Sequence, residues 1–158
     1  MVRHLAGAVL TVCFAWADVA WSAEAGEVIE HVIREAATAT SRFAETRDKQ
    51  TVLRHYAKDY LGVQDGESES RDAIEQWLSD YELELKKGNT LRFISAVSNV
   101  QPILADSIAW VTYDYTFQAV RNGDLVGQDV GKCTTLLRRE PSAWLIFHEH
   151  CSKIRPTQ

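Results

Sequence analysis

The stretch "SIAWVTYDYTFQAVRNGD" (Ser107–Asp124) carries the clearest pattern in the chain. Apolar and polar residues alternate through it, so every second side chain should lie on the same face of a β-strand. The apolar face would hold Ala109, Val111, Tyr113, Tyr115, Phe117 and Ala119. The Asn122-Gly123 pair that follows is typical of a two-residue hairpin turn. The stretch therefore predicts a half-buried strand that leads into an antiparallel neighbour.

The sequence on either side extends this sheet. "TLRFISAVSNVQPIL" (residues 90–104) alternates more loosely, a long strand runs from the hairpin to about Arg139, and "WLIFHEHCS" (residues 144–152) follows a turn at 140–143. Four consecutive antiparallel strands are expected.

Three helices are predicted before these strands. Residues 27–47 carry an apolar stripe at helical spacing, and Asp48 could cap a short second helix over residues 49–60, which would include Tyr56, Asp59 and Tyr60. Residues 62–70 form a turn-rich link, with a short strand at its start as an alternative, and a third helix ends at Gly88. The order predicts an α+β fold with three N-terminal helices packed on a curved antiparallel sheet.

The N-terminus has the layout of a secretory signal peptide. Arg3 precedes an uncharged apolar run, Leu5–Ala17, and Ala23-Glu24-Ala25 fits a cleavage site. The run is too short to span a bilayer well, which argues against an uncleaved anchor. We expect residues 1–25 to be a signal peptide, residues 26–158 to be the domain, and the protein to be periplasmic or secreted.

Composition excludes several functions. The chain has 17 Lys and Arg against 22 Asp and Glu, with charges of both signs scattered along it, so nucleic acid is not an expected partner. A Ser-His-Asp order, a phosphate loop, a Cys-x-x-Cys motif and a dinucleotide fingerprint are all absent from the sequence. No cofactor is expected, and no membrane contact after signal cleavage.

The segment "TTLLRREPSAWLIFHEHCS" (residues 134–152), together with "YDYTF" and "NGD" before it, resembles SnoaL-like proteins of the nuclear-transport-factor-2-like superfamily. It looks most like the branch that holds the association domain of calcium/calmodulin-dependent protein kinase II. The resemblance covers residues 27–153 and implies a cone-shaped, cystatin-like fold that forms a homodimer or higher homo-oligomer through its sheet. The superfamily contains isomerases, dehydratases, cyclases, hydrolases and non-catalytic oligomerisation modules, so fold alone does not assign function. The resemblance aligns Tyr115 and Thr135 with two pocket arginines of that branch, which argues against a pocket selecting carboxylates.

The final strand divides its polar residues between two faces. Alternation should place His148 and His150 with Trp144 and Ile146, and Glu149 and Cys151 with Leu145 and Phe147. Two histidines could chelate a metal, but a site needs further ligands. A structural or interfacial role on the outer face is the preferred interpretation, and no metal is expected.

Glu149 is the main candidate for chemistry. On the concave side a carboxylate against aromatic walls would have a raised pKa and could act as a general acid or base. The plainer alternative is a rim residue paired with Arg138 or Lys132. Asp59 is the second candidate base, and its alternative role is a surface carboxylate at a helix end.

Four tyrosines complete the predicted ligand site: Tyr56, Tyr60, Tyr113 and Tyr115. The competing interpretation is that they fill the core and only their hydroxyls reach a rim. The leading hypothesis is a protein that binds a small, partly apolar organic ligand. The rivals are a cofactor-free isomerase, dehydratase or cyclase that uses Glu149 or Asp59, and a non-catalytic oligomerisation module.

The cysteines of the domain can be placed by strand register. If Arg139 lies opposite Leu145, then Cys133 lies opposite Cys151, close enough for a disulfide. A register shifted by one residue would put Cys133 opposite His150 instead. A disulfide, two buried free thiols and a catalytic thiol are the three alternatives.

Overall fold

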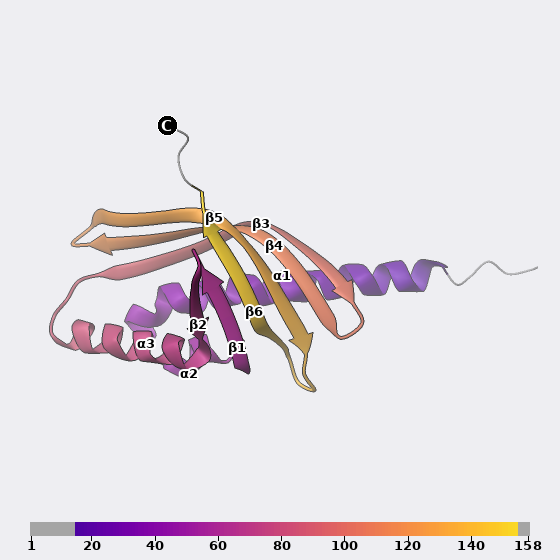
Figure 1. The fold of residues 1–158 in the computed structure, drawn as a ribbon, viewed down its shortest axis with the longest axis horizontal. Helices are drawn as coiled ribbons and strands as arrows, with labels where there is room; N and C mark the ends of the chain where they lie inside the picture. The colour runs from indigo at the N-terminus through magenta and orange to yellow at the C-terminus, as the bar shows by residue number, and fades with distance from the viewer. Residues whose placement is uncertain (1–14, 155–158) are drawn as a thin grey trace, which may run out of the picture.

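The computed structural model describes residues 15–154, with side chains from Glu24 onward. Three helices, α1 (Ala15–Thr46), α2 (Lys49–Leu53) and α3 (Arg71–Lys86), lie on one side of a curved six-stranded sheet (Figure 1). The strands are β1 (Tyr56–Gln64), β2 (Glu67–Ser70), β3 (Arg92–Ala105), β4 (Ile108–Arg121), β5 (Asp124–Arg139) and β6 (Trp144–Lys153). The predicted α+β fold is therefore confirmed.

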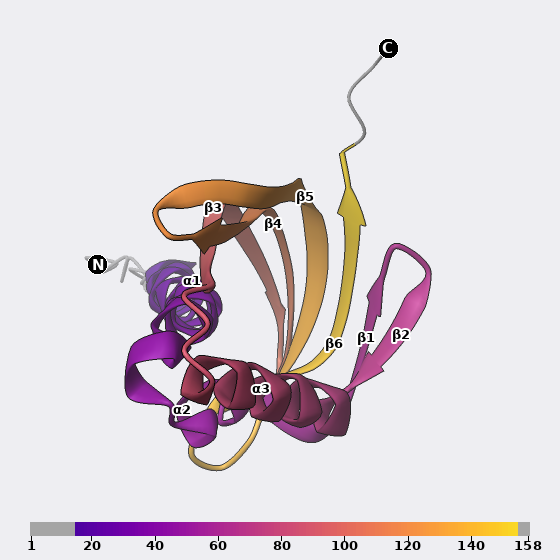
Figure 2. The ribbon, with the colours of Figure 1, turned by 90° about the vertical axis from the view of Figure 1, so that its left-hand side faces the viewer.

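The sheet is mixed rather than purely antiparallel. Its order is β2-β1-β6-β5-β4-β3, and β1 runs parallel to β6, whereas every other pair is antiparallel. Figure 2, seen from the end, shows the sheet curving around the space that α1 and α3 close from the other side. This curvature creates a concave inner face and a convex outer face.

The predicted second helix was wrong beyond its first turn. Asp48 does cap α2, since its Oδ1 accepts from the backbone N–H of Gln50 at 2.9 Å, but the helix ends at Leu53. Tyr56, Asp59 and Tyr60 lie on strand β1 instead. The spacing of these residues fits a helix, but in so short an apolar segment it also fits the two-residue period of a strand.

The predicted link at residues 62–70 instead holds the end of strand β1, a turn and the whole of strand β2. Asp65 and Gly66 both have positive φ angles, 52° and 94°, which is the geometry of a tight hairpin turn between β1 and β2. The Asn122-Gly123 turn between β4 and β5 has nearly the same angles, 54° and 91°, as predicted.

The core lies between the helices and the inner face. Phe43, Ile29, Leu53 and Leu78 are fully buried, and on β4 the alternation holds, with Ala109, Val111, Tyr113 and Tyr115 buried. Ser70 begins α3, accepting at Oγ from the N–H of Ala73.

A β-bulge in β6 changes which residues face inward. Leu137 pairs with Ile146, but Leu136 pairs with His148, so Phe147 is an extra residue between them. Ile146, predicted for the outer face, is instead 1% exposed and lies on the inner side with Glu149. Phe147, predicted for the inner face, lies under the guanidinium of Arg138, 5.6 Å from Cζ to the ring centre.

The predicted signal peptide falls partly outside the described residues, which begin at Ala15, within α1. None of the described helices combines the length and the apolar character needed to cross a membrane.

Candidate functional site

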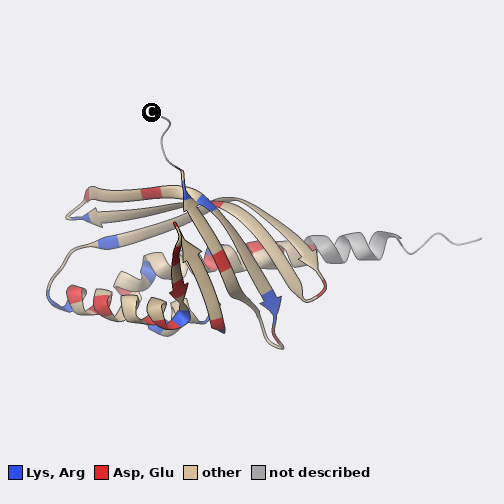
Figure 3. Cartoon of the chain, viewed as in Figure 1, with Lys and Arg blue, Asp and Glu red and all other residues tan. Residues whose placement is uncertain are grey.

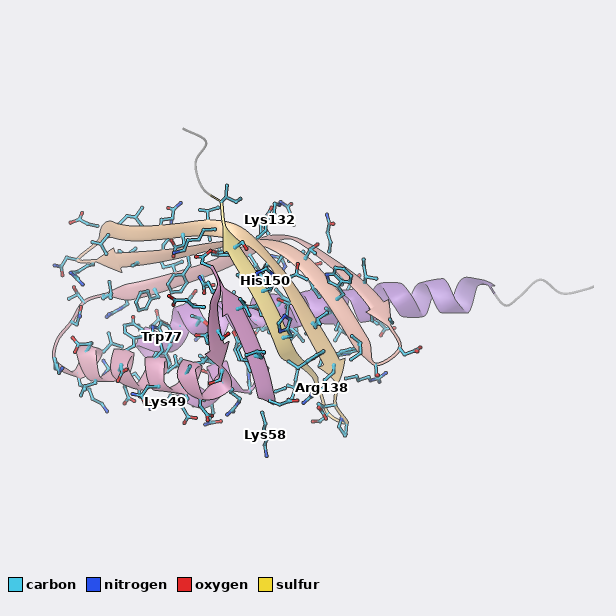
Figure 4. All side chains as sticks on the ribbon, viewed as in Figure 1. Lys49, Lys58, Trp77, Lys132, Arg138 and His150 are labelled. Atoms are coloured by element: carbon cyan, nitrogen blue, oxygen red, sulfur yellow. A yellow bond between two sulfur atoms is a disulfide. The ribbon has the colours of Figure 1, made fainter. Side chains whose placement is uncertain are left out.

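A cavity of about 320 Å³ opens on the concave face, between the sheet, α1 and α3. All five residues of the predicted ligand site line it: Tyr56, Tyr60, Tyr113, Tyr115 and Glu149. Its apolar wall adds Ile33 and Val52 from the helices, and Trp77, which extends from α3 toward the strands in Figure 4. The volume lies at the lower end of the range found for small-molecule sites.

Glu149 is held in the wall of this cavity through one of its two oxygens. Its Oε2 accepts hydrogen bonds from the Tyr113 hydroxyl at 2.9 Å and from the Thr135 hydroxyl at 3.0 Å. The two hydroxyl oxygens are themselves 3.2 Å apart. Thr135 is fully buried and lies directly opposite Glu149 across β5 and β6, so strand register fixes this cluster.

The second oxygen of Glu149 has no donor among the described residues. Its nearest polar neighbour is Cys151 Sγ at 3.6 Å, and a disulfide sulfur carries no hydrogen to donate. A carboxylate with one oxygen fixed and the other free is oriented and still able to accept a hydrogen bond or a proton from a ligand.

Burial raises the pKa of Glu149 above its usual value, and the hydrogen bonds from Tyr113 and Thr135 oppose that rise. The charge of Glu149 also affects the pKa of two neighbouring tyrosines. Burial and then the Glu149 charge raise the pKa of Tyr113 and of Tyr60, so both remain neutral phenols that can donate.

A second carboxylate, Glu69, lines the cavity and was missed in the sequence. Gly62 on β1 pairs with Glu69 on one side and with Glu149 on the other, so the three residues form one row across β2, β1 and β6. Figure 3 shows acidic positions on both strands that flank β1. Burial and then the charge of Glu149 raise the pKa of Glu69. The Asp65-Gly66 hairpin signal could have revealed this strand.

Gly62 leaves room for a tyrosine between the two carboxylates. A Cβ atom built on Gly62 would collide with the Oη and Cζ atoms of Tyr60. The Tyr60 phenol therefore occupies the space that a side chain at 62 would fill, over the middle of the row. Gly131 on β5 likewise leaves room for the ring of Tyr115 on β4.

Asp59 lies away from this cavity. Its two oxygens accept from the Arg138 guanidinium at 2.6 and 2.8 Å in an exposed pair, and those hydrogen bonds lower its pKa. The pair keeps Asp59 ionised and occupied, so this geometry does not fit the role of a catalytic base. Arg138 is thereby committed to Asp59 and Glu140 rather than to Glu149.

The cysteines meet where the register predicted. The strand turn is one residue tighter than expected, with Arg139 opposite Trp144, and the bulge at Phe147 restores the register so that Cys133 faces Cys151. The structure joins them in a disulfide with a Cα–Cα distance of 4.1 Å. Both cysteines line the cavity beside Glu149.

The histidine pair lies on the other side of the sheet. His148 pairs with Leu136 and with Leu61, and His150 is exposed on β6, where Figure 4 labels it. Neither lines the cavity.

A second cavity, of about 430 Å³, lies between α1 and the turn that joins β5 to β6. Its polar lining includes Arg139 and Glu140, which flank that turn. Glu24 and Ala25 form part of its wall and belong to the predicted signal peptide. The cavity on the concave face is therefore the stronger candidate.

Comparison with known proteins assigns the family. The model of the SnoaL-like domain matches residues 33–156. The chain therefore belongs to the SnoaL-like family. No curated protein matches it.

Solved structures agree on the fold. A conserved protein from Planctomyces limnophilus aligns with a TM-score of 0.67 at 14% identity, covering 84% of this chain and 98% of that one. An NTF2-like protein with a cystatin-like fold from Novosphingobium aromaticivorans gives 0.66 at 14%, covering 91% and 93%. An NTF2-like superfamily protein from Salmonella enterica gives 0.63 at 15%, covering 86% and 95%. At this identity the likeness establishes an NTF2-like, cystatin-like fold and leaves function open.

Proposed function

We propose that this protein binds a small, partly apolar organic ligand in the concave cavity, with Glu149 as the group that fixes the ligand's polar end. The observation that carries the proposal is the half-satisfied carboxylate. Tyr113 and Thr135 hold one oxygen, while the other has no donor among the described residues of a 320 Å³ cavity. A buried polar atom without a partner carries a free-energy cost that a ligand donor would remove.

The aromatic wall supports an apolar ligand body. Tyr56 packs edge-on against Tyr60, with ring centres 4.9 Å apart, and Trp77 contacts Phe93 at 5.4 Å. These contacts hold the rings in place before a ligand arrives, which lowers the entropic cost of binding.

Native mass spectrometry tests the proposal. Protein purified under mild conditions should carry a small organic mass that disappears on denaturation. Glu149→Gln should reduce the bound fraction severalfold, because the amide would present a donor where the ligand's own donor should lie. The exposed Glu45→Gln makes the same charge change outside the cavity and should retain the ligand. An empty wild-type chain that binds nothing from a small-molecule library would refute the proposal.

A cofactor-free enzyme is the second candidate, and one observation favours it. Glu149 combines a raised pKa with a neutral phenol at 2.9 Å, the pairing that a proton transfer next to a carbonyl requires. Isomerases, dehydratases and cyclases use this chemistry. Incubating the recovered ligand in deuterated water with wild type and with Glu149→Gln separates the two functions. Deuterium uptake or loss of water with wild type alone would identify an enzyme.

We further propose that the protein is exported and forms a dimer through the convex face. The predicted signal peptide and the disulfide support export, since disulfides persist in oxidising compartments. The convex face carries exposed apolar side chains in one row, including Ile103 at 66% and Trp110 at 53%. A purely structural module like the kinase association domain would need only this face, and the oriented carboxylate in the cavity would then have no role.

A further inference from the structure

The charged side chains that line the cavity are all acidic. Three carboxylates line it, Glu69, Asp129 and Glu149, and among the described lining residues there is no lysine, arginine or histidine. Asp129 pairs with Lys153 at 3.2 Å, whereas no ion pair within the described part of the chain involves Glu69 or Glu149.

The two unpaired acids face one space. Both pair with Gly62, from opposite sides, so their Cα atoms are two strand spacings apart, about 10 Å. The phenol of Tyr60 lies over Gly62 between them. The charge of Glu149 raises the pKa of Glu69. Two partly buried carboxylates that make no ion pair are costly to ionise, and a cation beside them would relieve that cost.

The remaining wall also suits a cation. Six aromatic side chains line the cavity: Tyr56, Tyr60, Trp77, Tyr113, Tyr115 and Phe117. Aromatic faces attract ammonium groups, most strongly where water is excluded, and they equally well pack against an apolar ligand body. An anionic ligand would meet only like charge and phenol hydroxyls. Neutral ligands could use the hydroxyls but would leave the two carboxylates uncompensated.

We propose that the ligand is an organic cation, an amine whose ammonium group contacts Glu69 and Glu149 beside the Tyr60 hydroxyl and whose apolar part packs on the aromatic wall. This inference rests on the proposed function, because it names the chemical class of the ligand for the same cavity. It assigns to Glu69 a direct binding role, and to Tyr60 a hydroxyl that accepts from the same ammonium.

Calorimetric titration with probes of matched shape tests the charge preference. Phenethylamine, phenethyl alcohol and hydrocinnamate share an aromatic ring and a short chain but carry positive, zero and negative charge. Tyramine and tryptamine extend the amine set to larger rings. At neutral pH at least one amine should bind about tenfold or more tightly than phenethyl alcohol, which corresponds to 1.4 kcal/mol. Hydrocinnamate should not bind.

Two variants locate the effect. Glu149→Gln and Glu69→Gln should each weaken amine binding about tenfold and leave the affinity for the alcohol unchanged. Glu45→Gln, on the exposed surface of α1, removes the same charge and should change neither affinity. Circular dichroism and thermal unfolding check that each variant is folded. If Glu149→Gln fails to fold, Glu69→Gln carries the test, because its hairpin lies at the sheet edge.

The outcomes separate this inference from the proposed function. Alcohol or carboxylate binding as tight as amine binding would overturn the cation assignment and leave a small-molecule site standing. Equal losses from Glu45→Gln and Glu149→Gln would overturn it too, because the effect would then be one of net charge. Failure of every amine to bind, with a retained neutral or anionic mass in the native spectrum, would have the same meaning. No binding by any probe and no retained mass would overturn both proposals.

Discussion

Two neighbouring cross-strand rows, one on each face of the sheet, differ in a way that reverses the usual expectation. The inner row is Glu69, Gly62, Glu149, Thr135, Val111 and Pro102, and three of its six residues are polar. One position along each strand, the outward row holds Ser70, Leu61, His148, Leu136, Trp110 and Ile103. Four of these six are apolar, and Leu61, Trp110 and Ile103 are about half exposed or more.

This reversal distinguishes residues placed for packing from residues placed for function. A sheet covered by helices on one side should be apolar inside and polar outside, because apolar burial drives folding. Carboxylates inside cost stability, so a function is the physical reason to place them there. Apolar groups outside leave a surface that a second copy of the chain could cover.

The largest contrast is expected at neighbouring cross-strand pairs. Replacing both Cys133 and Cys151 with serine opens a link between residues 18 apart and should lower the free energy of unfolding by about 3 kcal/mol. Thr134 and His150 pair one position along, on the outer face, and alanine at both should change it by less than about 1 kcal/mol. Denaturant unfolding of both variants measures the difference. Equal losses would show that the disulfide adds nothing beyond ordinary strand pairing.

A medium effect is expected at Gly62 and Leu61. Gly62→Ala inserts a methyl group into the space of the Tyr60 phenol, which should cost about 1–3 kcal/mol and displace the tyrosine. Leu61→Ala removes an exposed side chain and should change the stability of the monomer by about 0.5 kcal/mol or less. Thermal unfolding measures both. Ligand affinity should fall for Gly62→Ala alone, and an unchanged affinity would place Tyr60 outside the site.

The outer row should govern assembly without affecting the cavity. Trp110→Glu introduces a charge into the centre of the exposed apolar row and should convert a dimer into a monomer. Ligand binding per chain should stay within about twofold of wild type. Sedimentation velocity gives the subunit number, with Glu45→Gln as the control. A dimer that survives this substitution would mean that another surface forms the contact.

The sequence predicted strands β3 to β6 better than strands β1 and β2, which lie at one end of the sheet. Strands β3 to β6 follow from alternation and from the Asn122-Gly123 turn, because apolar side chains there face a core with period two. Strand β1 was read as a helix because Leu53, Tyr56, Ala57 and Tyr60 also fit a helical spacing. Strand β2, "ESES", has no apolar residue to mark it, and only the Asp65-Gly66 turn signals it.

The candidate site was predicted in part for the same reasons. Glu149 and Tyr113 were found because they lie on strongly patterned strands. Glu69 was missed with its strand, and Asp59 was misplaced with β1. The bulge at Phe147 carries no local signal, since it depends on how β5 and β6 pair in three dimensions. It nevertheless decides that Ile146 and Glu149 share a face.

The pH dependence of stability follows from the two kinds of carboxylate. Glu149 has a raised pKa, so its contribution to stability is fully present below the usual value of 4.5 and is lost as the pH rises through the raised pKa. Asp59 has a lowered pKa, so its contribution is present above the usual value of 3.8 and is lost as the pH falls through the lowered one. Glu149→Gln should therefore flatten the loss of stability on the neutral side of 4.5 and leave the loss at acid pH unchanged.

One measurement tests the central claim that the concave face holds an acid site and the surface does not. The side-chain carboxyl carbons of Glu149, Glu69 and Asp59 can be followed by nuclear magnetic resonance through a pH titration. We predict midpoints above the usual glutamate range for Glu149 and Glu69 and below the usual aspartate range for Asp59, with the first two falling when an amine is bound. A Glu149 midpoint within the usual glutamate range would contradict the account, because the carboxylate would then be solvated like any other on the surface.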